Sequence, residues 1–310
     1  GLRRAQGPDA GIYGARAAVI AGCIGTSNVL AGQMFDIPVK GTHAHSWVMS
    51  FQSELEAFRA YAKKFPDACL LLVDTYNTLE QGIPNAIQCF KEMKAAGYPL
   101  KGYGIRLDSG DLAYISKQAR KMLDAAGFED AIISASSDLD ENLSASLKLH
   151  AAKITLWCVG TKLITSDDCP AFGGVYKLAA ETDETGEFVP KIKLSNNPSK
   201  VTLPGIKKVI RIYDKTTNKI KADLITLEHE TYDENNPLTL FDQTATWKRM
   251  ELKPGSYYLR ELLTPVFVNG ECVYTSPKTM EIREYAQKEL NTLWDEHRRL
   301  ANPHTVHVDL

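Results

Sequence analysis

Along roughly the first 175 residues, the hydrophobic and polar positions form two kinds of segment that alternate. Short apolar or β-branched runs each end in a small polar cluster, and apolar residues at helical spacing follow. The runs predict five strands, at residues 37–40, 70–73, 104–107, 131–134 and 156–159. Strand and helix repeated five times predict parallel strands with crossover helices, and therefore a doubly wound sheet or an α/β barrel.

The segments between these strands have the periodicity of amphipathic helices. Apolar side chains recur on one helical face over residues 51–65, and again over residues 112–123, where Gly127 closes the segment. Asp138 and Glu141 stand three residues apart, which is the spacing of a capping pair, and predict the start of a third helix.

A polar cluster follows each predicted strand, and the clusters begin at residues 41, 74, 108, 136 and 160. Their starts are 33, 34, 28 and 24 residues apart, which is one strand-helix unit each. Because sites in such folds collect at the carboxyl ends of the strands, all five clusters should face a common mouth. An eight-stranded barrel at this spacing needs about 240 residues. With five or six units visible, we expect the remaining strands to precede Gly1.

The pattern of hydrophobic and polar residues changes after residue 180. Apolar runs at 209–213 and 220–227, separated by a polar turn, predict a β-hairpin, and residues 279–300 predict a charged amphipathic helix. We therefore expect two domains. The first, residues 1–180, is a doubly wound sheet or a partial α/β barrel with parallel strands; the second, residues 181–310, is smaller and β-rich with a terminal helix.

Composition narrows the function classes. Hydrophobic residues make up 44% and charged residues 24%, which excludes a disordered chain. The 36 basic and 38 acidic residues give a net charge of −2, which provides no electrostatic basis for binding nucleic acid or an anionic membrane. No apolar run has the roughly 18 residues of a membrane span. The six cysteines are far apart, with no CxxC pair, so we expect free thiols and a cytoplasmic location.

Two of the clusters are suited to phosphate. Ser109 and Gly110 precede a predicted helix, and Gly160 is followed by Thr161. Glycine lets backbone N–H groups approach an anion closely, and hydroxyls and a helix start add further donors. Each pair alone is more often a plain turn, but together on one edge they favour a phosphorylated substrate.

His43 and His45 share a face if their segment is extended. A metal site needs at least one more ligand of the right type, and the other histidines lie in predicted helices or the tail, so we expect no resident metal. Either histidine alone could be structural. A histidine at a strand end beside four polar clusters is better suited to acid-base or nucleophilic chemistry.

Arg106 and Asp108 are two residues apart at the end of a predicted strand, so their side chains should point the same way. They could form a buried salt bridge. The alternative, which we favour, is that the guanidinium binds a carboxylate or phosphate of a ligand while Asp108 binds sugar hydroxyls.

Five motifs in order resemble the nicotinate phosphoribosyltransferase family over essentially the whole chain; they occupy residues 1–9, 25–32, 41–46, 106–111 and 175–178. The resemblance implies an irregular α/β barrel joined to a second domain, usually as a homodimer. It also implies synthesis of nicotinate mononucleotide and pyrophosphate from nicotinate and phosphoribosyl pyrophosphate in NAD biosynthesis, coupled to ATP hydrolysis. ATP and Mg²⁺ would be co-substrates, with no tightly bound cofactor. The resemblance further implies an N-terminal stretch before Gly1, so we expect the chain to be truncated there relative to the family.

The resemblance also implies roles for individual residues. His45 matches the histidine that ATP phosphorylates, and His43 occupies a variable position of the same motif. Asp108 matches the catalytic region that holds the ribose, together with Ser109 and Gly110. The other substrate-binding positions implied are Arg3, Thr42, Arg106, Gly160 and Thr161.

Two alternatives stay open at this point. The truncation is compatible with a non-catalytic barrel fragment, or a subunit that depends on a partner. Within the enzymes, a nicotinamide or quinolinate phosphoribosyltransferase is the other possibility. Nicotinamide-using relatives carry an aspartate near the position of Ser27, and its absence here favours the acid as substrate.

Overall fold

A computed structural model of the chain describes residues 1–197, 200–242 and 245–309. Contacts divide the chain into two units, Gly1–Ala171 and Phe172–Leu310. In the first unit, four strands form one parallel sheet in the order β1 (Leu70–Leu72), β2 (Gly104–Leu107), β3 (Ile132–Ala135) and β4 (Leu156–Trp157). Four of the predicted strands, and their parallel arrangement, are therefore confirmed. In the described residues, this parallel sheet has four strands and is not closed into a barrel.

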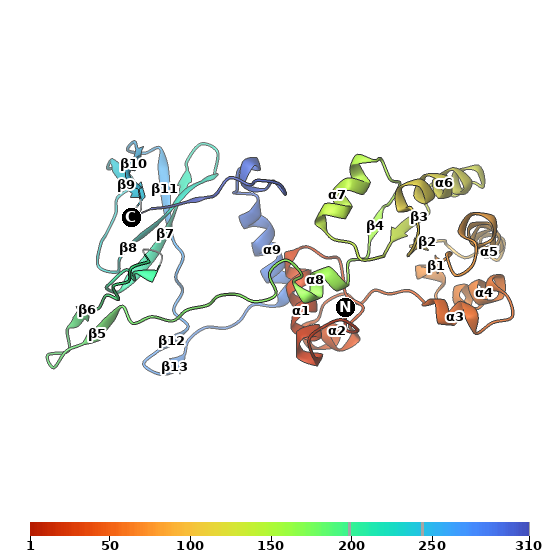
Figure 1. The fold of residues 1–310 in the computed structure, drawn as a ribbon, viewed down its shortest axis with the longest axis horizontal. Coiled ribbons are helices and arrows are strands. Elements are labelled where there is room, and N and C mark those ends of the chain that lie inside the picture. The colour runs from red at the N-terminus through yellow and green to blue at the C-terminus, as the bar shows by residue number, and fades with distance from the viewer. Residues whose placement is uncertain (198–199, 243–244, 310) are drawn as a thin grey trace. The chain divides into compact units, whose positions relative to one another are not determined.

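Helices alternate with these strands, as the periodicity predicted (Figure 1). The longer ones are α4 (Glu54–Lys64), α5 (Ile83–Ala95), α6 (Leu112–Ala125) and α7 (Glu141–Leu149). A 3₁₀ turn (Pro66–Ala68) precedes β1, a π-helical turn (Thr78–Gly82) precedes α5, and α8 (Thr161–Thr165) follows β4. The cap of α7 was predicted wrongly: Asp140, not Asp138, accepts a hydrogen bond from the backbone N of Leu143, at 2.6 Å.

The two faces of the sheet differ in chemistry because side chains alternate along each strand. Leu71, Ile105 and Ile133 lie in register and are fully buried in a core that includes residues of α4, α5 and α6. On the other face, Arg106 pairs in register with Leu72 and Ser134. The sheet therefore has a packed apolar face and a face that presents polar groups.

The N-terminal residues form α1 (Pro8–Ala21), α2 (Val29–Phe35) and the short α3 (His45–Met49). The strand predicted at residues 37–40 is wrong. Val39 forms only an isolated bridge with Thr26, and no residue of the segment joins the parallel sheet. Pro38 has no N–H to donate to a ladder, which limits pairing at this segment. Its carbonyl accepts from Thr26 N at 3.0 Å instead.

The second unit is rich in antiparallel strands. β7 (Lys207–Asp214) and β8 (Ile220–Leu227) form the predicted hairpin and lie in a sheet of order β11–β7–β8–β14, with β11 at Tyr257–Glu261 and β14 at His307–Asp309. Three two-stranded pairs accompany it: β5 (Ala180–Thr182) with β6 (Phe188–Pro190), β9 (Leu238–Asp242) with β10 (Ala245–Leu252), and β12 (Phe267–Val268) with β13 (Glu271–Cys272).

The terminal helix is shorter than predicted. α9 spans Thr279–Leu290, and a 3₁₀ turn at Asp295–His297 follows where the sequence predicted a continuous helix to residue 300. Lys219 Nζ donates to the carbonyls of Asn291 and Leu293, both at 2.9 Å. The chain leaves the helix at this point, and the side chain of Lys219 provides these carbonyls with a hydrogen-bond donor. In the described ranges, no helix combines the length and apolarity that crossing a membrane requires.

An ion-pair cluster holds α9 to the sheet of the second unit. Glu289 accepts from Arg260 Nη1 at 2.8 Å and Nη2 at 2.5 Å, while Arg211 pairs with Asp223 at 2.7 and 2.8 Å. The hydrogen bonds from Arg260 lower the pKa of Glu289. Arg211 Nη1 lies 3.7 Å from Glu289, so this one carboxylate serves two guanidinium groups.

We expect Glu289→Ala to lower the free energy of unfolding by about 2 to 4 kcal/mol, because two partly buried guanidinium groups lose their shared carboxylate. Urea denaturation measures this. Glu284→Ala is the matched control, since Glu284 is exposed on the same helix and should change stability by no more than about 0.5 kcal/mol. Equal effects of the two substitutions would contradict the assigned role of Glu289.

Candidate active site

Three strand-end residues meet at the carboxyl edge of the parallel sheet. Asp74 follows β1, Asp108 follows β2 and Ser136 follows β3. Asp74 Oδ2 accepts from the backbone N of Asp108 at 3.0 Å and from Ser109 Oγ at 2.5 Å. Ser136 Oγ donates to Asp108 Oδ1. The prediction that these clusters face one mouth is therefore correct for the loops after β1, β2 and β3.

His45 reaches this edge from α3, of which it is the first residue. Its Nδ1 lies 3.1 Å from Thr75 Oγ1, and its Nε2 lies 3.6 Å from Asp108 Oδ2. Its side chain is 39% exposed, which leaves the ring open to a ligand. The ring is thus held at one nitrogen by a hydroxyl, and the other nitrogen faces a carboxylate.

Arg106 lies on the polar face of the sheet, one residue before the end of β2. Its Nη1 donates to Thr42 Oγ1 at 2.5 Å, while its Nε is buried and has no hydrogen-bond partner among the described residues. Among the described residues, Arg106 and Asp108 form no ion pair with each other. The buried salt bridge that the sequence left open between these two residues is therefore not observed. Asp74 Oδ1 is likewise buried without a described partner. Buried polar atoms without partners are rare, which makes both atoms candidates for ligand contact.

His43 takes a structural position instead. Its Nε2 accepts from the backbone N of Leu72 at 3.2 Å, and its ring packs edge-on against Tyr61 at 4.7 Å. Burial lowers the pKa of His43 to about 4. His43 and His45 therefore contact different partners, although the extended-segment prediction put them on one face. In the described parts of the chain, no three histidine, cysteine or acidic side chains are grouped to hold a metal ion.

The neutral state of His43 predicts a pH dependence of stability. The unfolded imidazole has its ordinary pKa near 6.5, so between about 6.5 and 4 the unfolded chain binds a proton that the folded chain excludes. Stability is therefore complete above pH 6.5 and is lost as the pH falls. We expect a loss of about 2 kcal/mol between pH 7 and pH 5 from this residue.

Urea denaturation at the two pH values tests this expectation. His43→Gln should lower stability at pH 7 and flatten the pH dependence by that amount. His150→Gln, at an exposed histidine after α7, controls for the exchange of histidine for glutamine itself. An unchanged slope in His43→Gln would show that the imidazole is not held neutral.

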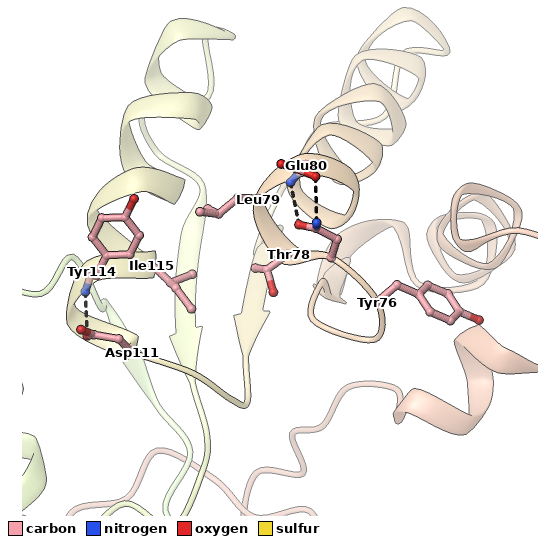
Figure 2. A pocket seen from close by; sticks show the side chains of 8 residues that line it. Tyr76, Thr78, Leu79, Glu80, Asp111, Tyr114 and Ile115 are labelled. Atoms are coloured by element: carbon pink, nitrogen blue, oxygen red, sulfur yellow. Dashed lines mark hydrogen bonds between the residues drawn. The ribbon is translucent and has the colours of Figure 1, made fainter.

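The loop after β2 contains Gly110 and leads into α6. Gly110 has φ +79°, a backbone conformation that favours glycine, and a Cβ there would lie 2.8 Å from Ile115 Cδ1. Asp111 caps α6, accepting from Tyr114 N at 3.0 Å. A hollow of about 460 Å³ lies beside this loop, between the starts of α6 and of the π-helical turn (Figure 2). Tyr76 and Tyr114 line it, whereas His45 and Arg106 do not.

Three predicted site residues lie apart from this network. Gly160 precedes α8 and Thr161 is its first residue; Thr161 accepts from Thr165 Oγ1 at 2.8 Å through its carbonyl. Arg3 is exposed in the turn before α1. Across the described ranges, none of the three forms a hydrogen bond or ion pair with His45, Asp108 or Arg106. Their assignment to the site stays a prediction.

Sequence reasoning did not single out Asp74, Thr75 or Ser136, although each belongs to a polar cluster at a strand end. The signal that could have found them was their position: each is the first or second residue of its cluster, one to three residues after its strand ends. In such folds the residues just beyond the carboxyl ends of the strands collect at the site.

Two family models match the chain: the nicotinate phosphoribosyltransferase (NAPRTase) family over residues 1–152, and the nicotinate phosphoribosyltransferase C-terminal domain over residues 206–310. A Bacillus subtilis protein named nicotinate phosphoribosyltransferase is 47% identical over 100% of this chain and 62% of its own length. A Dictyostelium discoideum protein of the same name is 34% identical over 98% of this chain and 59% of its own. The chain thus spans about three-fifths of the curated relatives it matches.

Solved structures are similar as well. The crystal structure of human nicotinic acid phosphoribosyltransferase has a TM-score of 0.80 and 28% identity, covering 100% of this chain and 67% of that one. A nicotinate-nucleotide pyrophosphorylase from Pyrococcus furiosus has a TM-score of 0.62 at 22% identity, covering 94% and 64%, which is a similarity of fold alone.

Proposed function

This chain belongs to the nicotinate phosphoribosyltransferase family, and on that premise we propose that the whole protein makes nicotinate mononucleotide in NAD biosynthesis. The pyridine nitrogen of nicotinate attacks the anomeric carbon of phosphoribosyl pyrophosphate, the bond from that carbon to the pyrophosphate oxygen breaks, and pyrophosphate leaves. ATP hydrolysis is coupled to this transfer, and Mg²⁺ would bind the phosphate groups of the substrates.

The observation that carries the proposal is the buried, unpartnered Nε of Arg106 beside Thr42, at the same sheet edge as His45 and Asp108. A guanidinium with a free donor in a partly buried place suits a carboxylate, which accepts paired hydrogen bonds from arginine. Nicotinate carries a carboxylate and nicotinamide does not. This arrangement therefore supports the acid as substrate.

His45 is the proposed acceptor of a phosphoryl group from ATP. Thr75 holds Nδ1, so Nε2 is the nitrogen open to the mouth. In the forward step a bond forms between this nitrogen and the γ-phosphorus while the bond to ADP breaks. Water later attacks the phosphorus and releases phosphate, which returns the free imidazole. The cycle consumes ATP and water and so can draw the phosphoribosyl transfer forward.

The remaining roles follow from position. Asp108 would accept hydrogen bonds from ribose hydroxyls, and Ser109 with Gly110 would contact the phosphate of the substrate. Arg3, Gly160 and Thr161 belong to the proposal on the strength of the family motifs alone. We expect a dissociative displacement at the anomeric carbon. The protein would accelerate it mainly by positioning the substrates and by electrostatic stabilisation.

Three broader statements are also proposals. The parallel sheet, with helices on its apolar face and Arg106 and Ser134 on the other, supports a partial barrel wall around the site. A homodimer follows from the family motifs. A cytoplasmic location agrees with the wide spacing of the six cysteines in the sequence, which contains no CxxC pair.

Product analysis of the whole protein tests the proposed function. Nicotinate and phosphoribosyl pyrophosphate should give nicotinate mononucleotide, and Mg-ATP should raise the yield, whereas nicotinamide and quinolinate should react much more slowly. Preference for nicotinamide or quinolinate would instead identify the protein as a nicotinamide or quinolinate phosphoribosyltransferase. Absence of product with all three would favour a protein that binds without turnover.

A further inference from the structure

We propose that Ser136 is a positioning residue that orients the Asp108 carboxylate toward His45; this inference rests on the proposed function. Ser136 Oγ donates to one oxygen of the carboxylate, Oδ1. The other oxygen, Oδ2, lies 3.6 Å from His45 Nε2. The serine therefore contacts the carboxylate and not the histidine, and its effect on the histidine passes through Asp108.

The sheet fixes the position of the Ser136 hydroxyl. The backbone N of Ser136 donates to the carbonyl of Leu107 at 2.8 Å, which continues the ladder between β3 and β2 beyond the last paired residues. Asp108 is fixed from the other side, since its backbone N donates to Asp74 Oδ2 at 3.0 Å. Both ends of the Ser136–Asp108 hydrogen bond are thus attached to strand ends.

A carboxylate held only by its backbone can still rotate about its terminal bond, because that torsion is broad. One strong donor on Oδ1 removes this freedom and fixes the plane of the group. The described residues provide that donor in Ser136. The carboxylate is therefore oriented by a hydroxyl donor, with no arginine or lysine ion pair to it among the described residues.

The test compares Ser136→Ala with Ser136→Thr, which keeps a hydroxyl at the same place. In the whole protein, we expect Ser136→Ala to lower kcat for nicotinate mononucleotide about 10- to 100-fold, the scale of one hydrogen bond to a charged group. The KM for nicotinate should change less than about twofold, because Arg106 and Thr42 are untouched. Ser136→Thr should restore most of the lost rate.

Ser116→Ala is the matched control for loss of a buried hydroxyl in the same unit. Ser116 Oγ donates to the carbonyl of Ala113 at 3.2 Å and accepts from Lys153 N at 3.0 Å, outside the site. This substitution should lower the thermal midpoint and leave kcat unchanged. If Ser136→Ala resembles Ser116→Ala in both respects, Ser136 is merely structural and the proposal is overturned.

A crystal structure of the Ser136→Ala protein decides the inference independently of activity. The proposal expects the Asp108 carboxylate to rotate and its distance to His45 Nε2 to differ from the 3.6 Å of the parent chain. An unmoved carboxylate would overturn it. Failure of the proposed function is distinguishable, because the unsubstituted protein would then make no nicotinate mononucleotide while the carboxylate would still rotate.

Discussion

Replacing His45 with alanine should abolish ATP hydrolysis coupled to phosphoribosyl transfer, with a loss of at least about a thousandfold, the scale on which removal of a covalent nucleophile acts. The His45 imidazole lies at the sheet edge, with Nδ1 3.1 Å from Thr75 Oγ1 and Nε2 3.6 Å from Asp108 Oδ2. Slow, uncoupled formation of nicotinate mononucleotide should persist, because Arg106 and Asp108 remain. Release of phosphate from ATP, measured with and without nicotinate, checks this result.

His150→Ala provides the matched control for loss of an imidazole. His150 is exposed at the end of α7, where its Nδ1 contacts the carbonyl of Ser146 at 2.8 Å. Coupled hydrolysis should continue at its normal rate in this variant. Normal coupled hydrolysis in the His45→Ala protein would instead remove His45 from the mechanism and leave the ATP-dependent step without an acceptor.

Replacing Arg106 with lysine should raise the KM for nicotinate about 10- to 100-fold. Lysine keeps the positive charge but loses the planar fork, the bond to Thr42 and the free Nε donor. The KM for phosphoribosyl pyrophosphate should change little, because the ribose and phosphate contacts are assigned to the loop after β2. Steady-state kinetics with each substrate varied in turn provide the measurement.

Arg59→Lys controls for the arginine-to-lysine exchange. Arg59 donates to Glu92 through Nε at 2.7 Å and Nη2 at 2.6 Å on the helical surface of the same unit. Its replacement should leave both KM values unchanged. A rise in the KM for phosphoribosyl pyrophosphate alone in Arg106→Lys would mean that Arg106 binds phosphate, and would overturn its assignment to the pyridine carboxylate.

The strand-helix alternation was predictable because burial on one face leaves a period in the sequence. Ile105 and Leu107 alternate with Arg106 along β2, and the same register links them to β1 and β3. The strand predicted at 37–40 failed because strand formation requires a partner. Ile37 is buried against α1 and α2, and only Val39 forms a bridge. A short apolar run cannot distinguish these two environments.

The ends of helices were less predictable than their faces. Both Asp138 and Asp140 can cap a helix, and the sequence favoured the pair with Glu141 at the right spacing. In the fold, Asp138 has φ +45° and Asp140 supplies the cap. Just beyond α9, the carbonyls of Asn291 and Leu293 accept from Lys219, which lies more than 70 residues earlier in the chain, and no local signal marks this partner.

For the candidate site, the sequence predicted which residues lie at the sheet edge but not which residues they contact. His45, Asp108 and Arg106 were expected at the mouth, yet their contacts are with Thr75, Ser136 and Thr42 respectively. These partners are small hydroxyl residues, which are common in ordinary turns and therefore carry little signal. The separate role of His43 depends on the backbone of Leu72, which only the folded sheet provides.

Mass spectrometry of the whole protein after incubation with Mg-ATP tests whether the sheet edge around His45 performs ATP-coupled chemistry. Peptide mapping under mild alkaline conditions preserves an acid-labile phosphoryl group and locates it. We expect one such group per chain, on His45, lost in acid and absent from the His45→Ala protein. A group on another residue, or none on a folded protein that forms nicotinate mononucleotide, would contradict the account.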